Sequence, residues 1–212
     1  MFSISCYNWL YNGIIIYVFW GKGLIALLKK IKYNSPVILT FVILAFLVLC
    51  INTYTNGYAN KMYFSVYRSS MHDFRFFIRL FAYVLGHTSW EHFTGNIMLI
   101  LAIGPMVEEK YGSQKLLIMI LFTTLITSLF NLAFFNTGII GASGIVFMLI
   151  LLASITQTSE GAIPLTLILV ALTYIGGQVI SGILNTDNIS QLSHILGGAC
   201  GCIFGLVSRK SE

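Results

Sequence analysis

Long apolar runs separated by short polar segments dominate the sequence from residue 36 onward. A helix that crosses the hydrocarbon core of a membrane needs about 20 mostly apolar residues. Several runs approach this length, and Pro36 opens the first of them at a position that suits the first turn of a helix. The pattern predicts six membrane-spanning helices at about residues 36–54, 90–106, 112–133, 141–157, 163–184 and 191–207.

Two segments depart from this pattern. Residues 55–89 mix charged side chains with many aromatic rings, which is typical of a segment in the membrane interface. Residues 1–34 contain an apolar stretch long enough to cross, but Asn12, Gly21 and Lys22 interrupt it. The sequence leaves open whether this part is an interfacial helix or a seventh crossing.

Composition supports a membrane protein. The chain is 57% hydrophobic and 9% charged, whereas a soluble domain is about half apolar and about a quarter charged. The net charge of +5 comes from too few residues to line a nucleic-acid groove, so we expect a lipid bilayer around the chain and no nucleic-acid partner.

The expected fold class is all-α, a polytopic membrane protein with a six-helix transmembrane bundle. We expect an N-terminal interfacial or extra membrane helix at residues 1–35, a six-span core at 36–208 and a cytoplasmic tail at 209–212. Lys29, Lys30 and Lys32 precede the first span, and the positive-inside rule places that end in the cytoplasm.

Polar side chains inside membrane segments indicate function, because each is costly to bury unless it is paired or used. His87 and His92 lie near the start of the second span, with Asn96 one turn further on, and His194 lies near the start of the sixth. Ser143, in GASG, begins the fourth span. Because these three spans run in the same direction, their first turns lie at similar depth and can converge.

A converging serine and histidine fit acyl-transfer chemistry. Ser143 can act as nucleophile with His194 as base, while Asn96 and His92 can donate to the oxyanion. None of the seven acidic residues lies mid-membrane at this depth, which favours a Ser–His dyad over a triad. HTSWEH lacks the spacing of an H-E-x-x-H metal site and membrane aspartates are missing, so we expect neither a metal nor a cofactor.

Each of these features also has a simpler structural interpretation. A lone membrane serine is usually an interhelical contact, and glycines spaced four apart, such as Gly197, Gly201 and Gly205, usually permit close helix packing. The segment from Glu108 to Lys110 is most simply a solvated turn between the second and third spans. The functional hypothesis therefore depends on the convergence of all the polar groups at one depth and not on any single residue.

The motifs together resemble the rhomboid family of intramembrane serine proteases over about residues 36–208. The resemblance rests on H-x4-H-x3-N, G-x3-E-x3-G, G-x-S-G and H-x2-G-x3-G, which begin here at His87, Gly104, Gly141 and His194. It implies a six-helix rhomboid-like bundle, and it implies that the fifth span and the loop near Asp187 act as a gate for the substrate helix.

The resemblance also implies roles for individual residues. Ser143 and His194 would form the catalytic dyad, and the Ser143 amide, Asn96 and His92 would form the oxyanion site. Supporting roles fall to His87, Phe147, Gly141 and Gly144.

Two positions depart from the family's pattern. The usual Trp-Arg pair of the first loop appears as Ile78-Arg79, which keeps the cation and loses the indole, so we expect altered loop stability. Phe147 stands where tyrosine is frequent, so stacking on His194 is expected without a hydroxyl contact.

The predicted function is an intramembrane serine endopeptidase that cleaves transmembrane segments of other membrane proteins through an acyl-enzyme. A catalytically silent rhomboid-like protein that binds membrane clients is the alternative. The expected location is a bacterial cytoplasmic membrane, with the protein multi-pass and its site open to the outer side. The sequence does not indicate the oligomeric state.

Overall fold

The computed structural model describes residues 32–156, 165–170, 172 and 188–209. The chain divides into two compact units, Met1–Asn34 and Ser35–Glu212. The alternatives for residues 1–34 fall almost wholly outside the described residues. All that follows concerns the second unit.

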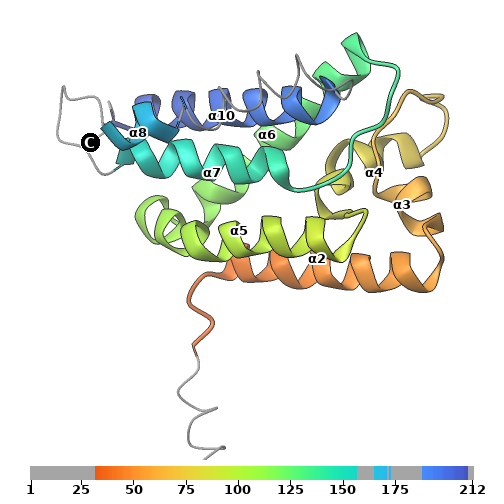
Figure 1. Cartoon of the computed structure of the whole chain (residues 1–212), viewed down its shortest axis with the longest axis horizontal. Helices are drawn as coiled ribbons and strands as arrows, with labels where there is room; N and C mark the ends of the chain where they lie inside the picture. Colours follow the sequence, from red (N-terminus) through yellow and green to blue (C-terminus); the bar gives the residue numbers. More distant parts are fainter. Residues whose placement is uncertain (1–31, 157–164, 171, 173–187, 210–212) are drawn as a thin grey trace, which may run out of the picture. The chain divides into compact units, whose positions relative to one another are not determined.

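The described part of the second unit is helical, and its only β structure is an isolated bridge between Val66 and Ile139. Five long helices form the bundle, and four short helical segments complete the described part (Figure 1). The long helices are α2 (Pro36–Tyr54), α5 (Trp90–Tyr111), α6 (Ser113–Phe134), α7 (Ser143–Thr156) and α10 (Asn188–Arg209). The short ones are α3 (Tyr58–Tyr63), α4 (Arg75–Ala82), the 3-10 turn η1 (Tyr83–Leu85) and α8 (Leu165–Val170).

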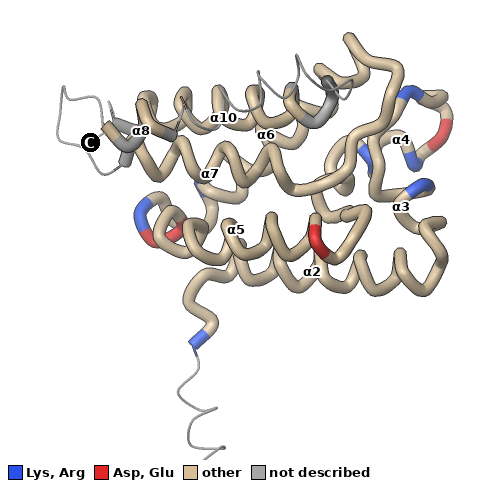
Figure 2. Tube along the Cα trace, in the orientation of Figure 1, with Lys and Arg blue, Asp and Glu red and all other residues tan. Residues whose placement is uncertain are grey.

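The predicted all-α membrane bundle is confirmed. The first predicted span matches α2 at both ends, and α2 and α6 are each long and apolar enough to cross a membrane. Charged residues gather at the ends of the long helices and leave most of their lengths uncharged (Figure 2). Of the predicted fifth span, only Leu165–Val170 and Leu172 are among the described residues.

Helix α7 is the core of the bundle, packed against α5, α6 and α10. Its side chains are buried on all sides, and those of Ile145, Met148, Leu149 and Leu152 are at most 1% exposed. A helix that is apolar all round is expected to be enclosed by its neighbours. This central position fixes the residues that begin α7.

Two glycines of α10 bring its backbone against that of α7. A Cβ atom on Gly197 would collide with the Gly144 backbone, and one on Gly201 would collide with the backbone of Met148. Small residues permit such close approach of membrane helices. The predicted close packing of the fourth and sixth spans is therefore confirmed, and it places the start of α7 beside α10.

In its C-terminal half, helix α6 turns its polar side chains inward, and several of its large apolar ones face outward. The five polar residues of this half are at most 2% exposed, and they are Thr123, Thr124, Thr127, Ser128 and Asn131. By contrast, Ile118 and Phe122 are at least half exposed. This is the arrangement expected in lipid, where polar groups need partners inside the bundle.

The prediction of a solvated turn at residues 108–110 is wrong for the turn and for Glu108, whereas Glu109 and Lys110 are exposed. Helix α5 continues through these residues to Tyr111, and Glu108 is buried at 4% exposure. Its carboxylate accepts hydrogen bonds from the Val37 and Ile38 amides, both at 3.0 Å, and from the Ser113 hydroxyl at 2.7 Å. The first amides of α2 have no partner within their own helix, so a carboxylate there is stabilising. Glu108 thus ties the start of α2 to the turn between α5 and α6.

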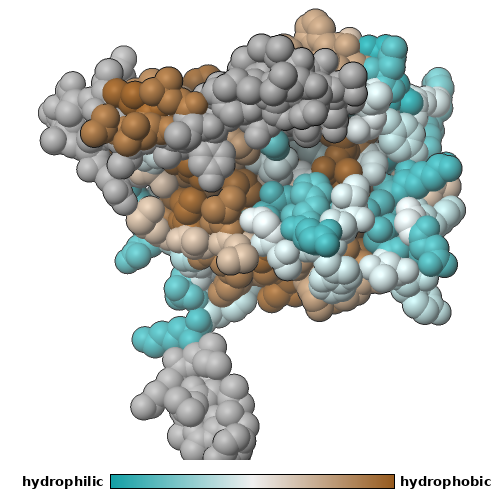
Figure 3. Space-filling view, viewed as in Figure 1, coloured by the Kyte–Doolittle hydropathy of each residue, from teal (hydrophilic) through white to brown (hydrophobic). Residues whose placement is uncertain are grey.

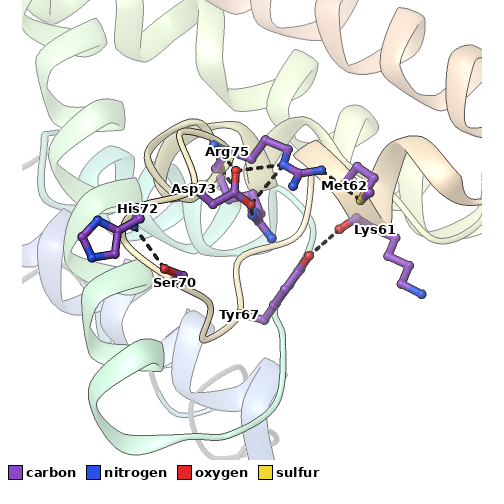
Figure 4. A network of polar contacts seen from close by, with 8 residues as sticks. Lys61, Met62, Tyr67, Ser70, His72, Asp73 and Arg75 are labelled. Carbon is purple, nitrogen blue, oxygen red and sulfur yellow. Dashed lines mark hydrogen bonds and ion pairs between the residues drawn. The ribbon is translucent and has the colours of Figure 1, made fainter.

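The loop between α2 and α5 is folded around buried Arg79. Its guanidinium lies 4.5 Å from the Tyr67 ring centroid and donates to Asp73 at 3.0 Å. Asp73 also accepts from Arg75 at 2.9 Å (Figure 4). Hydrophilic surface gathers where α3 and α4 lie (Figure 3). In this loop the positively charged guanidinium of Arg79 therefore lies against the aromatic face of Tyr67.

Candidate active site

A cavity of about 530 Å³ lies where α5, α7 and α10 meet the segment that precedes α7. The lining includes residues that the sequence singled out on three different helices and in the GASG motif, namely His92, Asn96, Gly141, Ser143, Phe147 and His194. The remaining lining is largely apolar. Of the polar groups predicted to converge from spans two, four and six, His92, Asn96, Ser143 and His194 line this cavity and His87 does not.

Ser143 is the first residue of α7, and it lies between Gly141, whose backbone conformation requires glycine, and Gly144, which packs tightly against α10. Gly141 has a φ of +119°, and a Cβ atom there would lie 2.7 Å from Cε1 of His92. On the other side, a Cβ atom on Gly144 would lie 3.3 Å from the carbonyl oxygen of Ser193. The two glycines thus let the serine turn sit between α5 and α10.

His194 lies in the second turn of α10, because this helix begins at Asn188, earlier than predicted. Its ring stacks on Phe147, with centroids 4.4 Å apart and planes 10° apart. Ser143 and Phe147 are separated by one turn of α7, so the stack holds the imidazole on the serine face of that helix.

The described contacts include no hydrogen bond between Ser143 and His194, and the Nδ1 atom of His194 has no partner among the described residues. Catalytic hydrogen bonds are often long in unliganded enzymes and tighten when substrate binds. Glu91 is the carboxylate among the described lining residues, and it is exposed near the cavity mouth. No described contact joins Glu91 to His194, so within the described residues no carboxylate orients the imidazole. Asp187 and the loop around it lie outside the described residues.

His87 lies behind the cavity wall and is completely buried. Its Nε2 atom is 3.2 Å from Nδ2 of Asn96, and its Nδ1 atom is 3.2 Å from the carbonyl oxygen of Leu85. When the Asn96 amide donates to Nε2, the ring proton resides on Nδ1 and donates to Leu85. A neutral His87 therefore satisfies both contacts and fixes the amide plane of Asn96.

His92 is oriented by residues that the sequence analysis did not single out. The Thr88 hydroxyl lies 3.2 Å from its Nδ1 atom, which leaves Nε2 on the side of Gly141. Ser89 is the N-cap of α5 and accepts from the His92 amide at 3.1 Å. A serine directly before an apolar span is an N-cap signal that could have identified Ser89.

Asn60 is a third missed residue, and no sequence signal pointed to it. Its Nδ2 atom donates to the carbonyl oxygen of His87 at 2.8 Å, and its own amide donates to Asn52 on α2 at 2.9 Å. The support of His87 therefore reaches across the loop to the first helix. Among the described residues, no cluster of histidine, cysteine or acidic side chains has the makings of a metal site.

The bundle and its cavity define a polytopic helical membrane protein whose polar groups gather near the starts of three helices. The family model for the rhomboid domain matches residues 75–211, which is more than half of the chain. The chain belongs to the rhomboid family, which comprises intramembrane proteases and their inactive relatives. No curated protein matches the sequence.

Proposed function

We propose that the protein is an intramembrane serine endopeptidase that cleaves transmembrane segments of other membrane proteins. The observation that supports this most is the cavity shared by Ser143, His194 and Asn96, which come from three helices. A silent relative that only binds clients has no need for a serine and a histidine facing one cavity. The preserved pair favours the enzyme.

Ser143 is the nucleophile in this proposal and His194 is the general base. Oγ of Ser143 attacks the scissile carbonyl carbon while its proton passes to His194, and the same proton then goes to the leaving amine. The acyl-enzyme on Ser143 is hydrolysed by water that His194 activates. Phe147 holds the imidazole from behind throughout.

The developing oxyanion is bound by donors from two helices. The backbone amide of Ser143 is at the start of α7, where the helix dipole favours negative charge. Asn96 offers the second N–H of its amide, because the first is directed at His87. His92 offers Nε2–H when Thr88 donates to Nδ1.

The substrate helix unwinds locally before it reacts, because a helix already satisfies its backbone groups and hides the scissile bond. The proposed location is a bacterial cytoplasmic membrane with the cavity open to the outer side. The protein's substrates can be identified by testing candidate membrane proteins for cleavage.

The test is cleavage of a reporter protein with one transmembrane segment by the purified full chain in proteoliposomes. Ser143→Ala and His194→Ala should each abolish cleavage. The matched control is Ser154→Ala, because Ser154 is on the same helix, does not line the cavity, and among the described residues its hydroxyl donates to the Ile150 carbonyl. Wild-type levels of cleavage by either dyad variant would remove the proposed mechanism.

A further inference from the structure

The segment between α6 and Ser143 is held in place by the long loop that precedes α5. Val66 and Ile139 exchange two backbone hydrogen bonds, both at 3.0 Å. The amide of Gly141 donates to the carbonyl oxygen of Tyr83, also at 3.0 Å. The loop therefore contacts this segment at its middle and at its end.

Arg68, from the same loop, fixes the start of the segment. Its Nε and Nη2 atoms donate to the carbonyl oxygens of Leu132 and Ala133 at 2.7 and 2.8 Å, and Nη1 donates to Oδ1 of Asn136 at 2.6 Å. Leu132 and Ala133 lie in the last turn of α6, where carbonyl groups lack helical partners. A guanidinium suits this place, because it presents several donors in one plane and its charge complements the helix dipole.

The segment between α6 and Ser143, which Arg68 and the loop hold in place, forms one wall of the cavity. Gly138, Ile139 and Ile140 all line it together with Ser143. Ser143 itself is held by a different set of contacts, namely the close packing of Gly144 against α10. Arg68 therefore acts on the start of the wall, whereas the serine turn is held by the contact of Gly141 with Tyr83 and by that of Gly144 with α10.

We propose that Arg68 is a positioning residue for substrate binding. It acts through the segment 136–140 and keeps that wall at the distance from Ser143 that a substrate requires. This inference rests on the proposed function, and it assigns Arg68 to binding and not to bond cleavage. Loss of the clamp should therefore raise KM and leave both kcat and the reactivity of Ser143 unchanged.

The test compares Arg68→Gln, Arg68→Lys and Arg75→Gln in the full chain in proteoliposomes. Arg75 is the matched control, because it is another arginine of this loop with an accessible side chain, and its described contacts are with Asp73 and Met62 and not with residues 132–141. We expect Arg68→Gln to raise KM about fivefold, the upper end of what an exposed charged contact contributes. Arg68→Lys should give a smaller rise, because lysine keeps the charge and loses the planar fork. Arg75→Gln should leave KM unchanged.

Two further measurements separate positioning from general damage. The rate at which a small fluorophosphonate labels Ser143 should be the same in wild type and Arg68→Gln, since that probe does not need the wall. Hydrogen exchange of the peptide that contains residues 135–141 should be faster in Arg68→Gln and unchanged in Arg75→Gln.

An unchanged KM with unchanged exchange in Arg68→Gln overturns the proposal, as does an equal loss of labelling and cleavage. A wild-type protein that neither cleaves nor is labelled defeats the proposed function instead. In that case the exchange comparison still decides whether Arg68 positions the wall.

Discussion

A single methyl group at Gly197 should separate the two helices that carry the serine and the histidine. A Cβ atom there would lie 2.7 Å from the carbonyl carbon and 2.9 Å from Cα of Gly144, whereas ordinary contacts are 3.4–4 Å. The methyl group is fixed to the backbone of one helix and meets the backbone of the other, so no side-chain rotation can relieve the collision. The helices must move apart by roughly 1 Å.

The effect on activity should exceed the effect on stability. Overpacking typically costs about 1–3 kcal/mol, and the better helix propensity of alanine offsets about 1 kcal/mol of this. A displacement of about 1 Å between catalytic groups can reduce turnover about 100-fold. Gly197→Ala should therefore lose about 100-fold in kcat/KM while the free energy of unfolding falls by at most about 2 kcal/mol.

Gly198→Ala is the matched control, on the same helix and with the same change in propensity. Its Cβ atom would meet only the end of the Leu151 side chain, at 3.0 Å, which can move aside. The assays are reporter cleavage and unfolding in mixed detergent for both variants. Wild-type turnover in Gly197→Ala, or an equal loss in Gly198→Ala, would refute this account of how the site is assembled.

Three further predictions concern other contacts. Glu108→Gln should lower the free energy of unfolding by about 1–3 kcal/mol, because the amide nitrogen cannot accept from the α2 amides or Ser113. In the same unfolding assay, Glu109→Gln should change this free energy by less than about 0.5 kcal/mol, because Glu109 is exposed. The pKa of Asp73 lies below its ordinary 3.8, mainly because the carboxylate accepts a hydrogen bond from the Arg75 side chain and then because it accepts one from the Arg75 backbone amide. The stability that these bonds contribute should be present above pH 3.8 and lost at lower pH. The thermal unfolding temperatures of wild type and Asp73→Asn should therefore converge as the pH falls below 3.8. Asn96→Ala should lower kcat about 100-fold with little change in KM, measured by reporter cleavage, because the donor acts on the developing oxyanion.

Much of the fold followed from the apolar pattern. Helix α2 carries no charge and begins with proline, so its limits were readable from sequence. The end of α5 was not, because Glu108 and its charged neighbours look like a solvated turn. Only the distant amides of Val37 and Ile38 explain why that carboxylate is buried, and no local pattern encodes contacts 70 residues apart.

The residues of the candidate site were likewise predictable from the sequence only in part. Histidines, asparagine and the glycine-flanked serine stood out because polar groups are rare in this chain, and helix direction was enough to predict that they meet. Asn60 and Thr88 did not stand out, because they lie in a segment where polar residues are common. Arg68 was visible as a charge, but its role depends on the fold that brings it to the end of α6.

The central claim is that His194 activates Ser143 within the membrane bundle. The most direct measurement is labelling of the purified full chain with a fluorophosphonate, followed by mass spectrometry of the modified peptide. We predict a single adduct on Ser143, absent in Ser143→Ala, at least about 100-fold slower in His194→Ala and unchanged in Ser154→Ala. An adduct on another serine, or equally fast labelling of Ser143 without His194, would contradict the account.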